Sequence, residues 1–328
     1  MTRRRVIVSG ARPTGRLHLG NYHGALKNWL ALQETDDCFF FVADWHALTT
    51  DYAESQAVRE NTVEMVLDWL ALGIDPARSV LFQQSAVQEH AELFVLLGML
   101  TPVPWLERNP TYKEQREALD GRDLSTLGFL AYPVLQAADV LLYKATAVPV
   151  GIDQAPHIEL AREIVRRFNG LFGDIFPEPQ TLLTETPKIV GTDGRKMSKS
   201  YGNAIYLTED PADIERKLAR MVTDPRRARR TDPGEPNDCP AYLSFHRTYC
   251  TPEELAWQEA GCRTASIGCL ECKQVTIRHV LRELAPVREQ RAKLRPEDAW
   301  RALEAGNARA RAVARETMAE VRAAMGLA

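Results

Sequence analysis

The sequence has no long run of hydrophobic residues. A helix that spans a bilayer needs about 20 consecutive, mostly apolar residues, and no stretch of this 328-residue chain approaches that length. Residues 2–9 contain an apolar run that is too short for a secretory signal. These absences predict a cytoplasmic protein that has no membrane partner.

Cysteine is also scarce, and its six residues are unevenly placed. Cys38 stands alone, whereas the other five lie between residues 239 and 272. In a chain without a secretion signal, disulfides are a poor explanation for such a cluster. The sequence contains no repeat and no low-complexity segment either.

Neither sign of charge is in large excess, because the net charge is −3. This value does not exclude a nucleic-acid partner, since RNA responds to local fields and not to the sum over the chain. Four arginines occur in one short stretch: Arg226, Arg227, Arg229 and Arg230. They form either a solvated surface or a contact for the sugar-phosphate backbone, and the sequence leaves both interpretations open.

Strand-like and helix-like segments alternate in the first part of the chain. Short apolar strands are expected at 5–9, 39–43 and 79–83. Continuous apolar strands connected by helices indicate a parallel sheet covered on both faces, and ligands bind at the carboxyl ends of such strands. The fold class is therefore α/β, with a Rossmann-type parallel sheet as the catalytic domain and a second, all-helical domain.

Composition places the domain boundaries. Up to about residue 187 the pattern is that of a nucleotide-binding fold, and after it the chain is helical and rich in Arg and Ala. The helical domain is expected at 188–296 and a terminal helix at 297–328.

The loop from Gly10 to Gly20 follows the first expected strand. Gly15 and Gly20 allow a ligand to approach the backbone closely, and a helix that begins near Gly20 directs its N–H groups toward an anion such as phosphate. His18 can donate to phosphate oxygens. Taken alone, the same residues fit a glycine-rich turn with a surface histidine.

Residues 196–200 follow a glycine-rich stretch whose composition is typical of a mobile loop. Lys196 and Lys199 are three residues apart, so both can reach a triphosphate and stabilise a leaving pyrophosphate, with Mg²⁺ sharing the charge. The alternative is a basic loop that faces solvent.

The segment 132–143 is apolar almost all round, which predicts a buried helix with Pro133 in its first turn. Gln136 and Asp139 place polar groups on one face of that helix. A buried carboxylate needs a partner. Two alternatives are open for Asp139. Either the fold supplies an Arg or a helix N-terminus as its partner, or the carboxylate belongs to a pocket and awaits a donor from a ligand.

Another strand–loop–helix junction lies at residues 148–157. Gly151 allows a sugar to approach, Asp153 can accept from ribose hydroxyls, and Gln154 can meet an α-amino or carboxylate group. By itself this signal is weak.

Several segments together resemble the bacterial tryptophanyl-tRNA synthetases, a family of class I aminoacyl-tRNA synthetases. His18-Leu19-Gly20-Asn21 resembles the HIGH signature, with Asn21 in place of its second His, and residues 196–200 are identical to the KMSKS signature. The other matching segments are SGARPTGRLHLGN, FVADWHALT, YPVLQAADVLLYK, VPVGIDQAPHIELARE, TDGRKMSKSYGN and VTDP. The resemblance covers essentially the whole chain.

The resemblance implies a homodimeric tryptophan–tRNA ligase. Such an enzyme converts ATP, as its Mg²⁺ complex, and L-tryptophan to tryptophanyl-adenylate, and then charges the 3′-terminal adenosine of tRNA(Trp). It also implies that the second domain binds the anticodon.

Individual roles carry over from the matching segments. The catalytic positions are His18, Lys196 and Lys199. The ATP-binding positions are Arg12, Pro13, Thr14, Gly20, Asn21, Gly151, Ile152, Asp153, Ile189, Lys196, Met197, Ser198, Lys199 and Ser200. The tryptophan positions are Asp139, as acceptor for the indole N–H, with Tyr132, Gln136, Gln154 and His46.

The chain departs from its relatives at three of these positions. Arg12 stands where many have Gln, Ile152 where many have Glu, and Gln136 where some have Met. Asp139 agrees with the family, and a buried acceptor left unpaired by phenylalanine would reject that amino acid strongly.

The spacing C-x22-C-x6-C-x2-C, formed by Cys239, Cys262, Cys269 and Cys272, resembles that of a subset of the family with a [4Fe–4S] cluster. Four thiolates suit this cluster. They also suit Zn²⁺, although structural zinc sites more often show two close pairs. Free thiols are the third alternative, and Cys250 lies outside the pattern.

Two other functions stay open. One is a tyrosyl-tRNA synthetase, which shares the fold. The other is a non-charging paralogue that binds tRNA and senses redox state through its cysteines, although the intact His18, Gly20, Lys196 and Lys199 argue against it.

Overall fold

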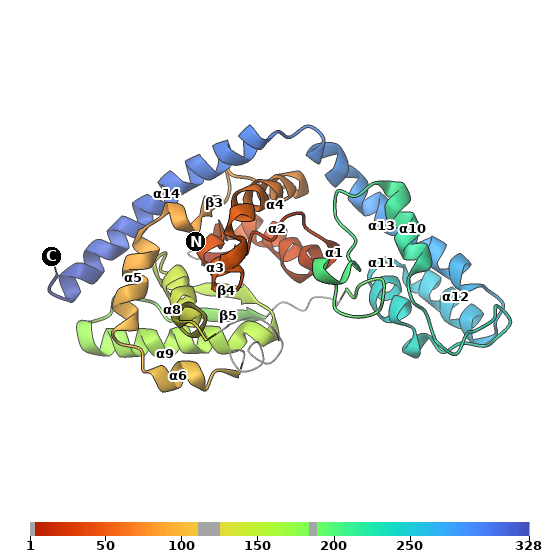
Figure 1. Ribbon diagram of the computed structural model, residues 1–328, viewed down its shortest axis with the longest axis horizontal. Helices are drawn as coiled ribbons and strands as arrows, with labels where there is room; N and C mark the ends of the chain where they lie inside the picture. Colours follow the sequence, from red (N-terminus) through yellow and green to blue (C-terminus); the bar gives the residue numbers. More distant parts are fainter. Residues whose placement is uncertain (1–3, 111–124, 184–188, 328) are drawn as a thin grey trace. The chain divides into compact units, whose positions relative to one another are not determined.

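The computed structural model describes residues 4–110, 125–183 and 189–327, and the chain divides into two compact units (Figure 1). The first unit comprises Met1–Gly15, Asn28–Glu185 and Arg295–Ala328. The second comprises Arg16–Lys27 and Thr186–Leu294. Both units are therefore discontinuous in sequence, and the segment Arg16–Lys27 belongs with residues far along the chain.

The first unit is built on a five-stranded parallel sheet with the strand order β3-β2-β1-β4-β5. The strands are β1 (Val6–Ala11), β2 (Asp37–Val42), β3 (Val80–Gln83), β4 (Ala147–Val150) and β5 (Gln180–Leu183). The three strands expected from the sequence are confirmed, with ends shifted by at most two residues. This strand order is that of a Rossmann-type sheet, so the predicted α/β fold is confirmed.

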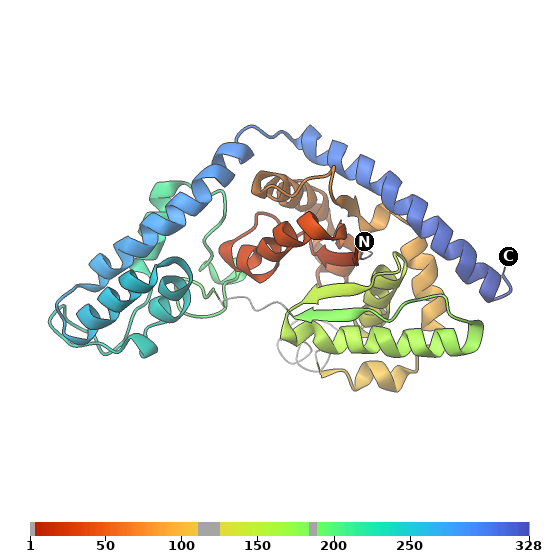
Figure 2. The ribbon, with the colours of Figure 1, turned by 180° about the vertical axis from the view of Figure 1, so that it is seen from behind.

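Helices cover both faces and one edge of the sheet. They are α2 (Lys27–Thr35), α3 (Asp44–Asp51), α4 (Val58–Leu72), α5 (Glu89–Gly98), α6 (Val103–Glu107), α8 (Leu127–Leu141), α9 (Ala155–Phe172) and α14 (Pro296–Ala324). Within this unit α9 packs against β5, and the long α14 packs against β3 (Figure 2). Fully buried side chains such as Phe82, Leu141 and Met318 join the sheet and its helices in one core.

Pro133 lies inside α8, and its expected place in the first turn is wrong. The helix begins earlier, because the Thr126 side chain caps it by accepting a hydrogen bond from the Phe129 N–H at 3.2 Å. A proline lacks the backbone N–H that an interior helical position normally uses. The cap at Thr126, and not the proline, therefore marks where this helix begins.

The second unit contains α1 (Leu19–Asn21), α10 (Pro211–Arg220), α11 (Arg247–Tyr249), α12 (Pro252–Arg263) and α13 (Cys269–Arg291). Two polar contacts tie its first segment to these helices. The Tyr22 hydroxyl donates to Glu283 Oε1 at 2.9 Å, and His23 Nε2 lies 2.7 Å from the Tyr249 hydroxyl. None of the described helices of either unit combines the length and apolar composition that crossing a membrane requires.

Helix α14 approaches the sheet so closely that only glycine fits at one position. A Cβ atom built on Gly306 would lie 1.7 Å from the Leu81 carbonyl oxygen of β3. The Asn307 side chain then accepts from the Gln83 N–H at 2.8 Å, so the helix also satisfies a donor of this edge strand.

We expect Gly306→Ala to destabilise the first unit by roughly 3 kcal/mol or more, because the backbones of α14 and β3 must separate. Thermal unfolding of the full chain measures this. Gly170→Ala is the matched control, since Gly170 is exposed on α9 and its added Cβ meets nothing within 4 Å. The control should gain up to about 1 kcal/mol from helix propensity, and equal effects of both variants would contradict the close approach.

Candidate active site

Asp139 on α8 is 1% exposed, and its carboxylate has three donors from the fold. Gln84 Nε2 and His90 Nδ1 each lie 2.7 Å from Oδ1, and His46 Nε2 lies 2.7 Å from Oδ2. The fold therefore supplies partners for this buried charge. The expectation of an Arg or a helix N-terminus as the partner is wrong, whereas the alternative, a carboxylate that also accepts from a ligand in a pocket, stays a prediction.

The charge state of Asp139 follows from these neighbours. Burial alone would raise the pKa of the carboxyl group, but the charge and hydrogen bonds of His46 and His90 hold the pKa below its ordinary value. The group is therefore an ionised acceptor. The partners come from three different elements, α3 for His46, the turn after β3 for Gln84, and α5 for His90.

A second buried histidine orients Tyr132. His157 Nδ1 accepts from Asn109 Nδ2 at 3.2 Å, and His157 Nε2 lies 3.1 Å from the Tyr132 hydroxyl. Burial lowers the pKa of His157 to about 4, so the ring is neutral and Nε2 carries its proton. Nε2–H then donates to the Tyr132 oxygen, which leaves the phenolic O–H to point elsewhere. Burial also raises the pKa of Tyr132 and keeps this hydroxyl protonated.

Most of the remaining residues expected in the first unit lie at the carboxyl ends of β1 and β4. Arg12 is exposed, with Nη1 3.3 Å from the Thr50 hydroxyl, and Pro13 beside it is buried. The exposed Asp153 carboxylate lies over Gly151, where a built Cβ would be 2.7 Å from Oδ1, so a side chain at position 151 would displace it. Gln154 Nε2 donates to Asp153 Oδ2 at 3.2 Å.

Position 152 presents an apolar side chain to solvent, because Ile152 is 78% exposed. Gln136 and Thr14 complete the expected set in this unit, Gln136 partly buried on α8 and Thr14 exposed after β1.

In the second unit, Asn21 fixes the proton of His18. The Asn21 N–H lies 3.3 Å from His18 Nδ1, and the Asn21 side chain accepts from the His18 N–H at 3.1 Å, so the two residues form a reciprocal cap of α1. Burial, with a contribution from the positive charge of Lys199, lowers the pKa of His18 to about 4. A neutral ring whose Nδ1 accepts carries its proton on Nε2. His18 is thus a neutral donor, and Gly20 packs beside it with a built Cβ 3.0 Å from the ring.

One buried asparagine organises the loop that contains residues 196–200. Asn203 Nδ2 donates to Asp193 Oδ1 at 2.7 Å and to the Lys196 carbonyl at 3.1 Å, and Asn203 Oδ1 accepts from the Ser198 N–H at 2.8 Å. A Cβ at Gly191 would lie 2.2 Å from the same amide. The loop is therefore closed over Asn203.

The side chains of this loop point in different directions. Met197 is 4% exposed and Ile189 is 7% exposed, so both anchor the segment. Lys196 and Ser200 are exposed, and Lys199 and Ser198 are partly buried. The loop thus presents cationic side chains from a fixed backbone.

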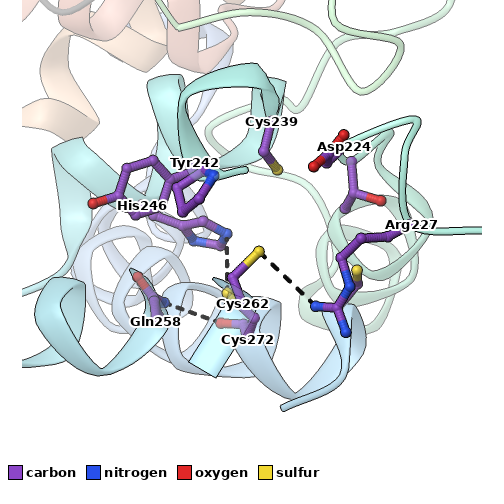
Figure 3. A pocket seen from close by; sticks show the side chains of 11 residues that line it. Asp224, Arg227, Cys239, Tyr242, His246, Gln258, Cys262 and Cys272 are labelled. Atoms are coloured by element: carbon purple, nitrogen blue, oxygen red, sulfur yellow. Dashed lines mark hydrogen bonds between the residues drawn. The ribbon is translucent and has the colours of Figure 1, made fainter. Parts of the chain in front are cut away.

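One pocket of the second unit is lined by the four cysteines of the C-x22-C-x6-C-x2-C pattern, Cys239, Cys262, Cys269 and Cys272 (Figure 3). Its volume is about 370 Å³, including space open to solvent. Arg227 lies with Nη1 4.0 Å from Cys262 Sγ, and His246 Nε2 lies 3.6 Å from Cys272 Sγ (Figure 3). Among the described residues, however, no three His, Cys, Asp or Glu side chains converge as a metal site. The expected iron–sulfur cluster is therefore not confirmed.

Burial raises the pKa of three of these thiols, to about 12 for Cys272. The neighbouring sulfurs also raise the pKa of Cys272, because a negative charge on one thiolate disfavours ionisation of the next thiol. In their free form Cys239, Cys262 and Cys272 are thus held as thiols.

Sequence reasoning missed Gln84, His90, Tyr143, His157 and Asn203. Each is a polar residue that the fold buries, and neither spacing nor hydrophobic periodicity marks such positions. For Gln84 a signal was its place, since it follows directly after β3, at the edge of the sheet where ligands bind.

Comparison with known proteins gives a consistent result. The family described as "tRNA synthetases class I (W and Y)" matches residues 1–285. The chain is 52% identical to the tryptophan–tRNA ligase of Thermotoga maritima and 46% identical to that of Aquifex aeolicus, and each match covers 98% of this chain and 99% of the relative.

Solved structures agree with the sequence comparisons. Tryptophanyl-tRNA synthetase from Campylobacter jejuni, complexed with ADP and tryptophan, has a TM-score of 0.85 at 32% identity, covering 98% of this chain and 100% of that one. A tyrosyl-tRNA synthetase from Archaeoglobus fulgidus has a TM-score of 0.66 at 21% identity, covering 88% and 90%. The second likeness shows the fold alone.

We expect His18 and His23 to stay neutral down to about pH 4, because burial lowers both of their pKa values to about 4 from 6.5. An unfolded chain binds protons at these rings from about pH 6.5 downward, so the free energy of unfolding should fall as the pH drops from about 6.5 to 4. Titration of the ring C–H signals by NMR measures both pKa values. Midpoints near 6.5 would show that the rings are solvated and would contradict the described packing.

Proposed function

The chain belongs to the tryptophanyl-tRNA synthetases of class I, and from this membership we propose its reaction and the residues that carry it out. It activates L-tryptophan with ATP to give tryptophanyl-adenylate and pyrophosphate. It then transfers the tryptophanyl group to the 3′-terminal adenosine of tRNA(Trp). The observation that carries the choice of tryptophan is the buried, ionised Asp139 with a partly occupied Oδ2.

Selection of tryptophan rests on Asp139. The indole ring offers one N–H donor, and Oδ2 has a lone pair left beside the bond from His46. Phenylalanine has no donor and would leave this acceptor unpaired in a buried site, which costs orders of magnitude in kcat/KM. Tyr132, Gln136, Gln154 and His46 line the rest of the amino-acid site, with the Tyr132 O–H oriented by His157.

Activation of tryptophan depends mainly on stabilising the charge that develops on the phosphates of ATP. The tryptophan carboxylate attacks the α-phosphorus, and the bond to pyrophosphate breaks in line. His18 donates Nε2–H to phosphate oxygens as a neutral group, Lys196 and Lys199 stabilise the leaving pyrophosphate, and Mg²⁺ bound to the triphosphate shares this role. Arg12–Thr14, Gly20–Asn21 and Gly151–Asp153 contact the nucleotide, and Ile189 meets the adenine.

Pyrophosphate exchange, run in parallel with tryptophan and tyrosine, tests the assignment. We expect exchange that depends on tryptophan and not on tyrosine, and Asp139→Ala should raise the tryptophan KM and relax selectivity while the chain stays folded. Exchange that depends on tyrosine alone would overturn the assignment in favour of a tyrosyl-tRNA synthetase. Unchanged discrimination in Asp139→Ala would refute the role of this carboxylate.

The cysteine pocket is the site of a proposed [4Fe–4S] cluster, with Cys239, Cys262, Cys269 and Cys272 as ligands. Support comes from the donor set, four sulfurs that line one pocket together with Arg227. Lys273 is also close to the sulfurs and 7% exposed: burial lowers its pKa, and the charges of Cys269, Cys239 and Cys272 oppose that shift. Thiolates bound to iron need such compensation, and the cluster would supply a rigid cross-link of the helical domain.

Iron, acid-labile sulfide and zinc per chain, measured on protein purified without oxygen, decide the occupant of this pocket. We expect iron and sulfide near four each, and Cys250→Ser, which lies outside the spacing, should leave both unchanged. Stoichiometric zinc would replace the cluster by a structural zinc site. Absence of all three would leave free thiols.

The helical domain is proposed to bind the anticodon of tRNA(Trp), and the chain to form a homodimer. Of the four arginines after Pro225, Arg227 is held inside by the carbonyls of Arg230 and Ile267, at 2.7 and 2.9 Å. The exposed Arg229 suits the RNA backbone better. For the dimer, the support is a set of exposed apolar side chains on α5, α6 and the start of α8: Val95, Met99, Val103 and Leu127.

A further inference from the structure

His90 is fully buried in the first unit and bonded on both ring nitrogens. Nδ1 lies 2.7 Å from Asp139 Oδ1, and Nε2 lies 2.7 Å from the Tyr143 hydroxyl. The relative exposure of His90 is 0% and that of Tyr143 is 2%. The reaction described above uses neither side chain, although both stand behind the carboxylate that selects the substrate.

The position of the His90 protons follows from the chemistry of its partners. An ionised carboxylate only accepts, so Nδ1 carries a proton and donates it to Asp139. Burial and the charge of Asp139 raise the pKa of Tyr143, so its hydroxyl stays protonated and holds the ring through Nε2. The ring is thus fixed between Tyr143 and the carboxylate.

The two oxygens of Asp139 are treated differently. Oδ1 accepts from His90 and from Gln84 Nε2, both at 2.7 Å, which uses both of its lone pairs. Oδ2 accepts from His46 alone among the described contacts. The side chain of His46 is 12% exposed, whereas His90 and Gln84 are 0% exposed. Oδ2 is therefore the oxygen on the side that solvent, and thus a substrate, can approach.

We propose that His90, held by Tyr143, is a positioning residue that saturates Oδ1 together with Gln84 and so aims Oδ2 of Asp139 at the ring N–H of the amino-acid substrate. The inference rests on the proposed role of Asp139. It adds that discrimination for a ring N–H depends on residues that never touch the substrate. Without the His90 donor the carboxylate can rotate and gain a proton, and both changes weaken its preference for a donor.

The experiment compares tryptophan with 3-(benzothiophen-3-yl)alanine, in which sulfur replaces the indole N–H within the same ring shape. The change in the ratio of kcat/KM values for the two amino acids in pyrophosphate exchange, variant against wild type, reports the N–H contact, because the larger size of sulfur is common to all variants. His90→Leu should lower this ratio by about tenfold or more. His90→Asn should keep it within about threefold of the wild type, because the Asn Nδ2 occupies the place of Nδ1 and still donates.

Two further variants complete the test. Tyr143→Phe removes only the hydroxyl that holds His90, so the ratio should fall in the same direction by a smaller factor; this variant and His90→Asn carry the test if His90→Leu does not fold. Thr62→Val is the control, because it removes a buried hydroxyl from α4, whose bond goes to the Val58 carbonyl, and it should leave the ratio unchanged.

Four results separate the proposals. An unchanged ratio in His90→Leu and Tyr143→Phe would overturn the positioning role while Asp139 keeps its own. Equal losses in His90→Leu and His90→Asn would also overturn it, since shape and not the donor would then matter. A wild type that does not distinguish the two amino acids refutes the role of Asp139 and this inference with it, and a wild type without tryptophan-dependent exchange refutes the proposed function.

Discussion

The ionised carboxylate of Asp139, buried inside an apolar helix, is the constraint on which the first unit depends. A buried charge must be matched by donors, and here they are drawn from α3, from the turn after β3 and from α5. The sheet is thus fixed to α8 through polar groups as well as through its core. The arrangement that stabilises the charge also determines which oxygen of the carboxylate is left for a substrate.

Neutral histidines of defined tautomer recur in both units. The partner of each ring places its proton: Asn21 for His18 and Asn109 for His157. Burial keeps the pKa of His18 and of His157 near 4, so these rings serve as donors of fixed direction over the physiological pH range and do not switch charge. Asn21, which stands where the HIGH signature has its second His, thus fixes the orientation of the His18 ring.

Much of the fold follows from the sequence, because continuous apolar runs report burial in a parallel sheet. The same reasoning located Asp139 as a buried acceptor. It could not find the partners of Asp139, since the identity of a polar residue after a strand does not reveal what it faces across the fold. Pro133 was placed in a first turn because proline favours that position, whereas the cap at Thr126 started the helix earlier. The sequence also did not show that Arg16–Lys27 belongs to the same unit as Thr186–Leu294. That grouping depends on contacts between residues far apart in the chain, which local sequence patterns do not reveal.

The close contact of α14 with β3 has a consequence for synthesis of the chain on the ribosome. β3 is an edge strand, and an uncovered edge can pair with other chains. Its cover, including Asn307 and the Arg309 guanidinium that donates to the Ser79 carbonyl at 3.3 Å, is translated more than 200 residues after it. Through that interval the nascent sheet exposes an open edge, and the first unit becomes complete only when the residues from Arg295 onward have emerged. Until α14 has been synthesised, this edge is protected only if translation is fast enough or if a chaperone binds the nascent chain.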